Sequence, residues 1–297
     1  MKSLEQLSTS LTEYDGEDQV ISSYEMQIKF KEKPEFLVAV KSFIPSVDKC
    51  TEDFRDGELI VISGPTKGGK TLFAQSLTVA FAKQQYTPLW FSFEISARQF
   101  LSQFREPLPL IYMPQKLRAH ALTWFKDRCE ESFLKYHTRI IFIDHLHYLI
   151  DLAKLRNPSI EIGQIIRQLK ILAVEKGYII FLLCHTTKGG SDPNLSYESI
   201  RDSSFVSQES DCVMMIKRTP ADGEMAAKLR IEFHRRTGVL EKVVKLFKHN
   251  GYLVEIENDR DSGPDLARSA EGKRSPESSS PSSRTLSGKD YAAGNGR

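Results

Sequence analysis

The chain has 297 residues, of which 40% are hydrophobic and 27% are charged, so it can bury the core of one large or two small globular domains. Its formal net charge of +2 excludes an overall basic character, and any contact with nucleic acid must therefore come from a local patch. The four cysteines lack paired metal-ligand spacing, the N-terminus lacks an apolar signal core and no apolar run could span a bilayer, which together predict a cytoplasmic protein without membrane contact.

Three regions of different composition predict the domain organisation. Residues 1–43 are polar and weakly periodic, and we expect an N-terminal arm or linker, or a short helix that docks elsewhere. Residues 44–257 alternate β-branched or aromatic runs with helical patterns, which is typical of an α/β domain with a mostly parallel central sheet flanked by helices. Residues 258–297 are rich in Ser, Pro, Gly and charge, and we expect a disordered tail because little apolar surface is available to offset the entropy of ordering.

The expected elements of residues 44–257 alternate between strands and helices. In chain order they are a strand at 58–63, a helix at 70–83, a strand at 88–93, helices at 96–105 and 119–135, a strand at 139–143, a helix at 160–175, and strands at 178–184, 211–217, 228–233 and 243–247. Three of these strands are followed directly by a polar residue, namely Glu94, Asp144 and His185. Ligands of open α/β sheets lie at the carboxyl ends of the strands, so we expect these three side chains to converge on one site.

The pattern G-x-x-x-x-G-K-[ST] follows the first of these strands and opens the first helix, which is the structural context of a phosphate-binding P-loop. Its glycines let successive backbone amides point at an anion, and the start of the helix adds its positive dipole end. We expect Lys70 to reach the β and γ phosphates and the Thr71 hydroxyl to bind Mg²⁺. The predicted ATP-binding residues are Gly64, Pro65, Thr66, Lys67, Gly68, Gly69, Lys70 and Thr71.

Two carboxylates at strand ends fit the remaining chemistry of ATP hydrolysis. Asp144 is the acid expected to hold Mg²⁺ indirectly through water, although a carboxylate in this position could instead cap a helix. Glu94 is expected to polarise the water that attacks the γ-phosphate, which requires its strand to lie beside the strand of Asp144. The alternative for Glu94 is a surface residue that caps the helix expected at 96–105.

Three further segments resemble a known family. Ser92-Phe-Glu94-Ile-Ser96, Ile143-Asp144-His-Leu-His147 and the segment 200–211 together resemble the RecA-type motor domain of DnaB-like hexameric replicative DNA helicases, which include the mitochondrial helicase Twinkle. The resemblance extends over about residues 44–257, including the segment 44–61 that leads into the P-loop. It implies a RecA-like P-loop NTPase that unwinds DNA as a ring of six subunits, with ATP and Mg²⁺ bound between neighbours.

The resemblance also assigns roles to residues outside the P-loop. His185 matches a residue that senses the γ-phosphate, although it could simply be a histidine at the end of a strand. Arg235 matches an arginine finger supplied to the nucleotide of the adjacent subunit, where it neutralises charge in the transition state. Arg236 is a rival for that role, and either arginine could be a plain surface charge.

The chain departs from the family pattern in two residues and in length. Phe233 stands where the family usually has a lysine two residues before the finger, which puts full ATPase strength in doubt. His147 stands where glutamine is common, which affects coupling more than binding. The N-terminal arm is too short for the collar or primase domain of these enzymes, so we expect any ring to rely on the motor domains and the short arm, or on a replication partner that supplies the missing domain.

A polar, glycine-containing stretch at 186–199 is the expected contact with single-stranded DNA. Lys188 and Arg201 supply charge for sequence-tolerant binding to the phosphates, although the stretch could also be an ordinary surface loop. The lysines of 242–248 alternate with apolar residues and are interpreted as the wet face of a strand. Two other functions share the same pocket, namely a KaiC- or RadA-like ATPase without unwinding activity and a loading factor switched by nucleotide.

Overall fold

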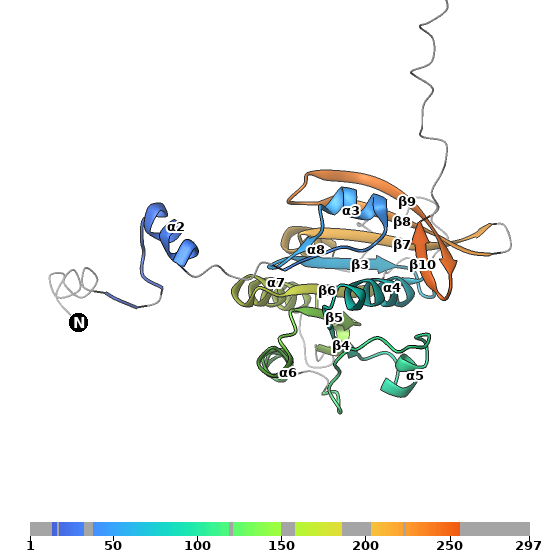
Figure 1. Cartoon of the computed structure of the whole chain (residues 1–297), viewed down its shortest axis with the longest axis horizontal. Helices are drawn as coiled ribbons and strands as arrows, with labels where there is room; N and C mark the ends of the chain where they lie inside the picture. Colours follow the sequence, from blue (N-terminus) through green and yellow to red (C-terminus); the bar gives the residue numbers. More distant parts are fainter. Residues whose placement is uncertain are drawn as a thin grey trace, which may run out of the picture. The chain divides into compact units, whose positions relative to one another are not determined.

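The structure of the protein is a computed structural model that describes residues 14–16, 18–32, 38–118, 121–149, 158–185, 203–221 and 224–255 (Figure 1). None of the helices within these ranges combines the length and the apolar character needed to cross a membrane. The tail expected at 258–297 lies outside the described residues.

The larger of two sheets has eight strands in the order β10-β9-β8-β7-β3-β6-β5-β4, which Figure 1 shows from β9 in orange to β4 in green. The strands are β3 Leu59–Gly64, β4 Leu89–Ser92, β5 Ile140–Asp144, β6 Ile179–His185, β7 Cys212–Ala221, β8 Glu224–His234, β9 Val239–His249 and β10 Tyr252–Glu255. The neighbours within β7-β3-β6-β5-β4 pair in parallel. The pairs β7–β8, β8–β9 and β9–β10 are antiparallel. The predicted, mostly parallel α/β sheet is confirmed.

The buried strands are apolar on both faces because helices cover both. Along β3, Ile60 and Ile62 belong to one core cluster, together with Phe73 of α4, while Leu59 and Val61 belong to a second cluster on the opposite face. The second cluster includes residues of α6 and α7. Strand residues that alternate between two covered faces read as a continuous apolar run, which is why the sequence pattern predicts these strands well.

The helices of the structure include those expected at 70–83, 119–135 and 160–175, a shorter one within 96–105, and two, Pro45–Thr51 and Ser203–Glu209, that the sequence pattern does not predict. The helices are α2 Ser23–Glu32, α3 Pro45–Thr51, α4 Lys70–Lys83, α5 Ala97–Leu101, α6 Leu122–Tyr136, α7 Pro158–Lys176 and α8 Ser203–Glu209, with a 3₁₀ turn η1 at Leu146–Leu149. The helix expected at 96–105 is shorter, because the amides of Gln103 and Phe104 bond to carbonyls three residues back, which is a tighter turn than an α-helix. Phe100 and Phe104 are both buried, so the helix-like spacing reflects the core and not the length of the helix.

The segment before the P-loop has structure that the sequence pattern does not reveal. Two-residue strands, β1 Ala39–Val40 and β2 Phe54–Arg55, pair antiparallel and enclose α3. The Asp48 carboxylate accepts hydrogen bonds from the amide and hydroxyl of Ser42, each at 2.6 Å, and from the amide of Phe43 at 3.1 Å. Val38 and Val40 are buried, so the packed core begins before residue 44.

Candidate active site

The loop between β3 and α4 has a backbone that only glycine fits. A Cβ atom on Gly64, whose φ is 153°, would lie 2.1 Å from the carbonyl oxygen of Ile216. A Cβ atom on Gly68 would lie 2.7 Å from the carbonyl oxygen of Pro65. Gly69 has a φ of 103° and stands directly before the first residue of α4. The geometry therefore agrees with a loop whose amides face an anion at the start of a helix.

Lys70 is held inside this loop. Its Nζ atom donates to the carbonyl oxygens of Gly64 at 2.9 Å and Pro65 at 3.0 Å, and it lies 3.1 Å from Nδ1 of His185. Burial lowers the pKa of Lys70, an effect that the nearby Asp144 and Glu94 carboxylates oppose. The amine is thus positioned at the loop before any phosphate arrives.

The three polar strand ends converge as expected. Glu94 follows β4, which lies beside β5 with Ser92 paired to Asp144, so the condition that the two strands be adjacent is met. The Thr71 hydroxyl donates to Oδ2 of Asp144 at 3.2 Å, and Nε2 of His185 lies 3.9 Å from Oε2 of Glu94. One edge of the sheet therefore carries the loop lysine, two carboxylates and a histidine.

The capping alternative for Glu94 does not fit the geometry. The N-cap of α5 is Ser96, whose hydroxyl accepts a hydrogen bond from the amide of Gln99 at 3.3 Å. Glu94 lines the P-loop cavity, and its carboxylate is 45% exposed there. Its carboxylate is therefore available to a water molecule in that cavity.

The chemistry of the donor set suits Mg²⁺ at Thr71 and Asp144. A hydroxyl and a carboxylate lie 3.2 Å apart, and Mg²⁺ prefers oxygen ligands of this kind.

His145 also reaches the site, because its φ of 85° directs the chain away from β5 and leaves its ring 4.7 Å from that of His185. Donor atoms of Glu94, His145 and His185 lie within 4.8 Å of one another. No motif in the sequence marks His145 as a site residue, although it directly follows Asp144.

Asp144 is nearly fully buried, and this raises its pKa to about 6, with the Glu94 carboxylate acting in the same direction and the Thr71 hydroxyl and Lys70 opposing it. A carboxyl whose pKa is higher in the folded protein than its ordinary value of 3.8 costs stability when it ionises, so stability is lost as the pH rises from about 4 to 6. We therefore expect Asp144→Asn to raise the free energy of unfolding at pH 8 by about 2–3 kcal/mol.

Urea unfolding of both proteins across pH 3.5–8 measures this difference. The gain should shrink on acidification and nearly vanish at pH 3.5, where Asp144 is mostly protonated in both states. An equal gain at every pH would show that the asparagine acts through packing and not through charge.

A cavity of about 610 Å³ opens beside the loop, a size suited to a nucleotide. Besides the P-loop residues, its wall contains Glu94, His185 and the cations Arg105, Arg218 and Lys248. The three cations come from the segment after α5, from β7 and from β9. No motif marks these three cations in the sequence, where the pattern around Lys248 indicates only the solvent-exposed face of a strand.

Arg235 lies at the end of the sheet where β3 begins, opposite the end that carries the P-loop. Its amide donates to the carbonyl oxygen of Asp211 at 2.7 Å, and Asp211 bonds to Leu59, the first residue of β3. The P-loop begins at the other end of β3, about 20 Å away for a strand of this length. Arg235 is not among the residues that line the P-loop cavity, and its exposed guanidinium donates to the carbonyl oxygen of Gln208 at 2.7 Å.

The rival arginine is bound into the fold. Arg236 pairs with Glu58 at 2.8 Å and donates to the carbonyl oxygens of Thr51 at 2.6 Å and Asp53 at 2.8 Å. A guanidinium with three such partners is not free to enter another site. Phe233, the departure from the family pattern, is half-buried and packs against the second core cluster.

The expected DNA contacts Lys188 and Arg201 lie outside the described residues, as does the side chain of His147.

Comparisons with known proteins agree with this fold. Residues 110–253 match the family described as DnaB-like helicase C terminal domain. A probable replicative DNA helicase of Trieres chinensis is 28% identical over 184 residues, which are 60% of this chain and 38% of that protein. The chain therefore spans well under half the length of that curated relative.

Two solved structures share the fold. One, an isolated ATPase domain, matches with a TM-score of 0.65 and 19% identity, over 80% of this chain and 99% of that chain. A DnaB-like replicative helicase, solved to describe its interactions with primase, matches with a TM-score of 0.63 and 19% identity, over 86% of this chain and 73% of that chain. The predicted RecA-like fold and the predicted resemblance are both confirmed.

Proposed function

Because residues 110–253 match the DnaB-like helicase C-terminal domain, we propose that this protein hydrolyses ATP to move along single-stranded DNA and unwind duplexes during replication. The observation that supports this best is the convergence of four residues at the carboxyl ends of the parallel strands, namely Lys70, Thr71, Asp144 and Glu94. Arg235 lies at the opposite end of the sheet, near the start of β3. An ATP site completed by the opposite edge of a neighbour suits a closed ring, and we propose a homo-hexamer.

Each residue at the P-loop edge has a role in hydrolysis. The loop amides and Lys70 hold the phosphates, and Mg²⁺ bound at Thr71 and, through water, at Asp144 would neutralise charge on the phosphate oxygens. Glu94 accepts a proton from the attacking water as its oxygen bonds to the γ-phosphorus and the bond to the β–γ bridging oxygen breaks. The products are ADP and inorganic phosphate.

His185 connects two of these groups. Its Nδ1 contacts Lys70 at 3.1 Å and its Nε2 faces Glu94 at 3.9 Å. When a phosphate engages Lys70, the contact between Lys70 and His185 is weakened, so the imidazole can report nucleotide occupancy to the water activator. We propose that His185 also relays this state to Lys188 and Arg201, that these two residues contact the DNA strand, and that the protein works with a replication partner.

Replacing Lys70 with alanine tests the site. We expect Lys70→Ala to abolish ATP hydrolysis measured with and without single-stranded DNA, because the phosphates lose their cation. Lys83→Ala is the matched control, since Lys83 is an exposed lysine at the far end of the same helix. Retained hydrolysis in Lys70→Ala would overturn the assignment of the ATP site.

A strand-displacement assay tests the motor. The proposal requires that hydrolysis be stimulated by single-stranded DNA and that a duplex with a single-stranded tail be opened in the presence of ATP. Stimulation without displacement would favour a RadA-like ATPase, and tight ATP binding with slow hydrolysis that DNA does not change would favour a loading factor.

A further inference from the structure

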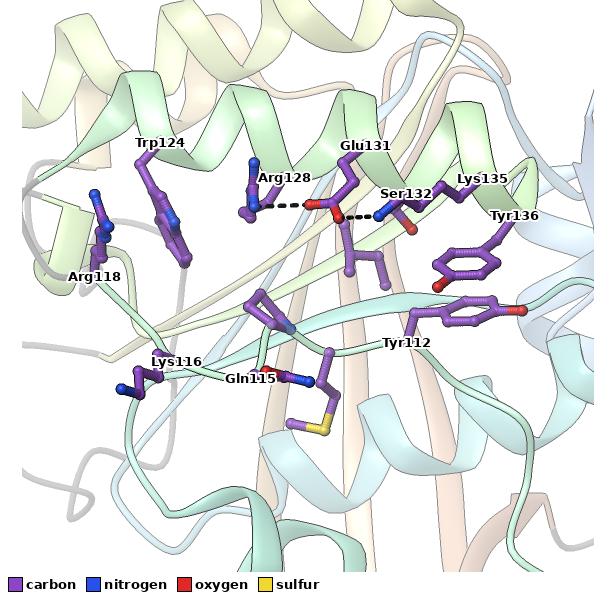
Figure 2. A pocket seen from close by; sticks show the side chains of 13 residues that line it. Tyr112, Gln115, Lys116, Arg118, Trp124, Arg128, Glu131, Ser132, Lys135 and Tyr136 are labelled. Carbon is purple, nitrogen blue, oxygen red and sulfur yellow. Dashed lines mark hydrogen bonds and ion pairs between the residues drawn. The ribbon is translucent and has the colours of Figure 1, made fainter.

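A second cavity, here called the edge cavity, lies beside β4, the last strand in the order of the sheet, and Leu89 of β4 is among its lining residues. It has a volume of about 560 Å³ and shares no lining residue with the P-loop cavity. Figure 2 shows α6 on one side and the segment 112–118 on the other, with side chains from both directed into the space between them. Its lining includes Tyr112, Lys116, Arg118, Trp124, Arg128 and Tyr136.

One face of α6 forms a long wall of this cavity. Trp124, Arg128, Ser132 and Tyr136 follow one another at intervals of four residues, so their side chains lie in a row. The row is about 18 Å long at the rise of an α-helix, which is longer than one nucleotide. The cavity therefore suits an extended ligand better than a small ion.

The charge of the edge cavity is strongly positive. One carboxylate, that of Glu131, pairs with Arg128 at 2.8 Å and with Lys135 at 2.6 Å. Lys116 and Arg118 have no ion pair within the described part of the chain. The Nε atom of Arg128 is buried and has no hydrogen-bond partner among the described residues. Two exposed cations and one buried donor without a described partner fit an anionic ligand that brings several oxygen acceptors.

Aromatic rings stand at both ends of the row. At one end the rings of Tyr112 and Tyr136 are stacked, with centroids 3.9 Å apart, and Tyr136 is 46% exposed. At the other end Trp124 is half-buried and meets Phe91 edge to face. Flat aromatic surfaces beside cations are the two features that bind single-stranded nucleic acid without sequence preference, by stacking on bases and by pairing with phosphates.

We propose that the edge cavity binds a short stretch of single-stranded nucleic acid, with phosphates on Lys116, Arg118 and Arg128 and bases on Trp124 and Tyr136. This proposal rests on the proposed function, because it gives the motor a second contact with its strand. The contact lies apart from the P-loop cavity and does not use Lys188 or Arg201. An acidic peptide would satisfy the cations but would leave the exposed aromatic faces without stacking partners.

The chain carries a local reporter for this site. Of its two tryptophans, Trp90 is fully buried and Trp124 lines the cavity. Titrating an oligo-dT strand into the nucleotide-free protein should quench tryptophan fluorescence, because a base stacks on Trp124. Trp124→Phe should remove the quenching while fluorescence anisotropy of a labelled strand still reports binding. Quenching that persists in Trp124→Phe would overturn the proposal.

Charge reversal tests the phosphate contacts. We expect Lys116→Glu with Arg118→Glu to weaken the binding that quenching reports by at least about tenfold and to reduce its salt dependence by about 1.4 in the slope of log K against log salt. The matched control is Lys242→Glu with Lys245→Glu, which makes the same change in charge on exposed residues of β9 and should leave quenching intact. Equal effects of the two pairs would overturn the proposal.

Other outcomes separate this site from the proposed function. DNA-stimulated ATP hydrolysis without any quenching would refute the edge cavity and leave the motor standing. Quenching without ATP hydrolysis would support nucleic-acid binding at the edge cavity and would refute the proposed ATP-driven motor function. Displacement of oligo-dT by poly-glutamate at lower concentration than by a second oligo-dT would overturn nucleic acid in favour of an acidic peptide.

Discussion

Replacing Arg235 with alanine should lower the rate of ATP hydrolysis about 10³- to 10⁵-fold, the range found for arginine fingers, while ATP binding to the same subunit remains. The reason is geometric, because Arg235 stands at the edge where β3 begins and the P-loop stands at the edge where β3 ends. We therefore propose that the lost charge acts at the neighbour's site. Steady-state ATPase rates together with equilibrium binding of a fluorescent ATP analogue measure both quantities.

Mixing variants shows in which subunit the arginine acts. Arg235→Ala subunits keep an intact P-loop, and Lys70→Ala subunits keep an intact Arg235. A 1:1 mixture should recover activity up to about a quarter of the wild-type rate, because random assembly in a head-to-tail ring joins an intact P-loop to an intact arginine at that frequency. No recovery in a mixture that forms rings would contradict a finger acting on the neighbour.

Arg236→Ala is the natural comparison. It removes the ion pair with Glu58 and two hydrogen bonds to carbonyl oxygens, so we expect a loss of stability of about 1–3 kcal/mol. The finger role would pass to Arg236 if Arg236→Ala, and not Arg235→Ala, lost ATP hydrolysis and regained it on mixing with Lys70→Ala.

The second large effect is expected at Glu94. Glu94→Gln should lower ATP hydrolysis about 10²- to 10⁴-fold, because the amide cannot accept the proton of the attacking water. ATP binding should persist, since the Glu94 carboxylate raises the pKa of Asp144 and its removal favours the ionised Asp144 that Mg²⁺ requires.

Glu130→Gln controls for the loss of one surface charge, because Glu130 is an exposed residue of α6. Single-turnover hydrolysis and ATP binding are measured for both variants. A Glu94→Gln protein that hydrolyses ATP at the rate of Glu130→Gln would assign water activation elsewhere, with His145 the nearest other candidate.

Local patterns in the sequence predict much of the site because its key residues stand next to strongly apolar strands. β3, β4, β5 and β6 are buried on both faces, so their ends are sharply marked, and Glu94, Asp144 and His185 stand at or just after the ends of β4, β5 and β6. The P-loop adds a pattern in which each glycine has a steric reason, as at Gly64. In these places the local signal and the tertiary structure agree.

Residues that reach the site through pairing of distant strands could not be predicted in this way. Lys248 and Arg218 line the P-loop cavity only because β9 and β7 run along the same sheet as β3. The remote position of Arg235 follows from the antiparallel direction of β8, which returns its end to the start of β3. Periodicity identifies strands, but it does not give their order or direction.

The short elements before the P-loop escaped prediction for a different reason. β1 and β2 have two residues each, too few for an alternating pattern, and α3 is stabilised by the hydrogen bonds that Asp48 accepts outside the helix. Such segments depend on contacts with the rest of the core, as the buried Val38 and Val40 show.

The six residues of β3 separate the P-loop at one end of the strand from Arg235 near the other, the residue that we propose to serve a neighbour. On that proposal a solitary chain would bind ATP without the positive charge needed in the transition state, and turnover would depend on assembly of the subunits. Dilution below the concentration at which subunits associate should silence hydrolysis, so that nucleotide is consumed only where enough chains have gathered to work together.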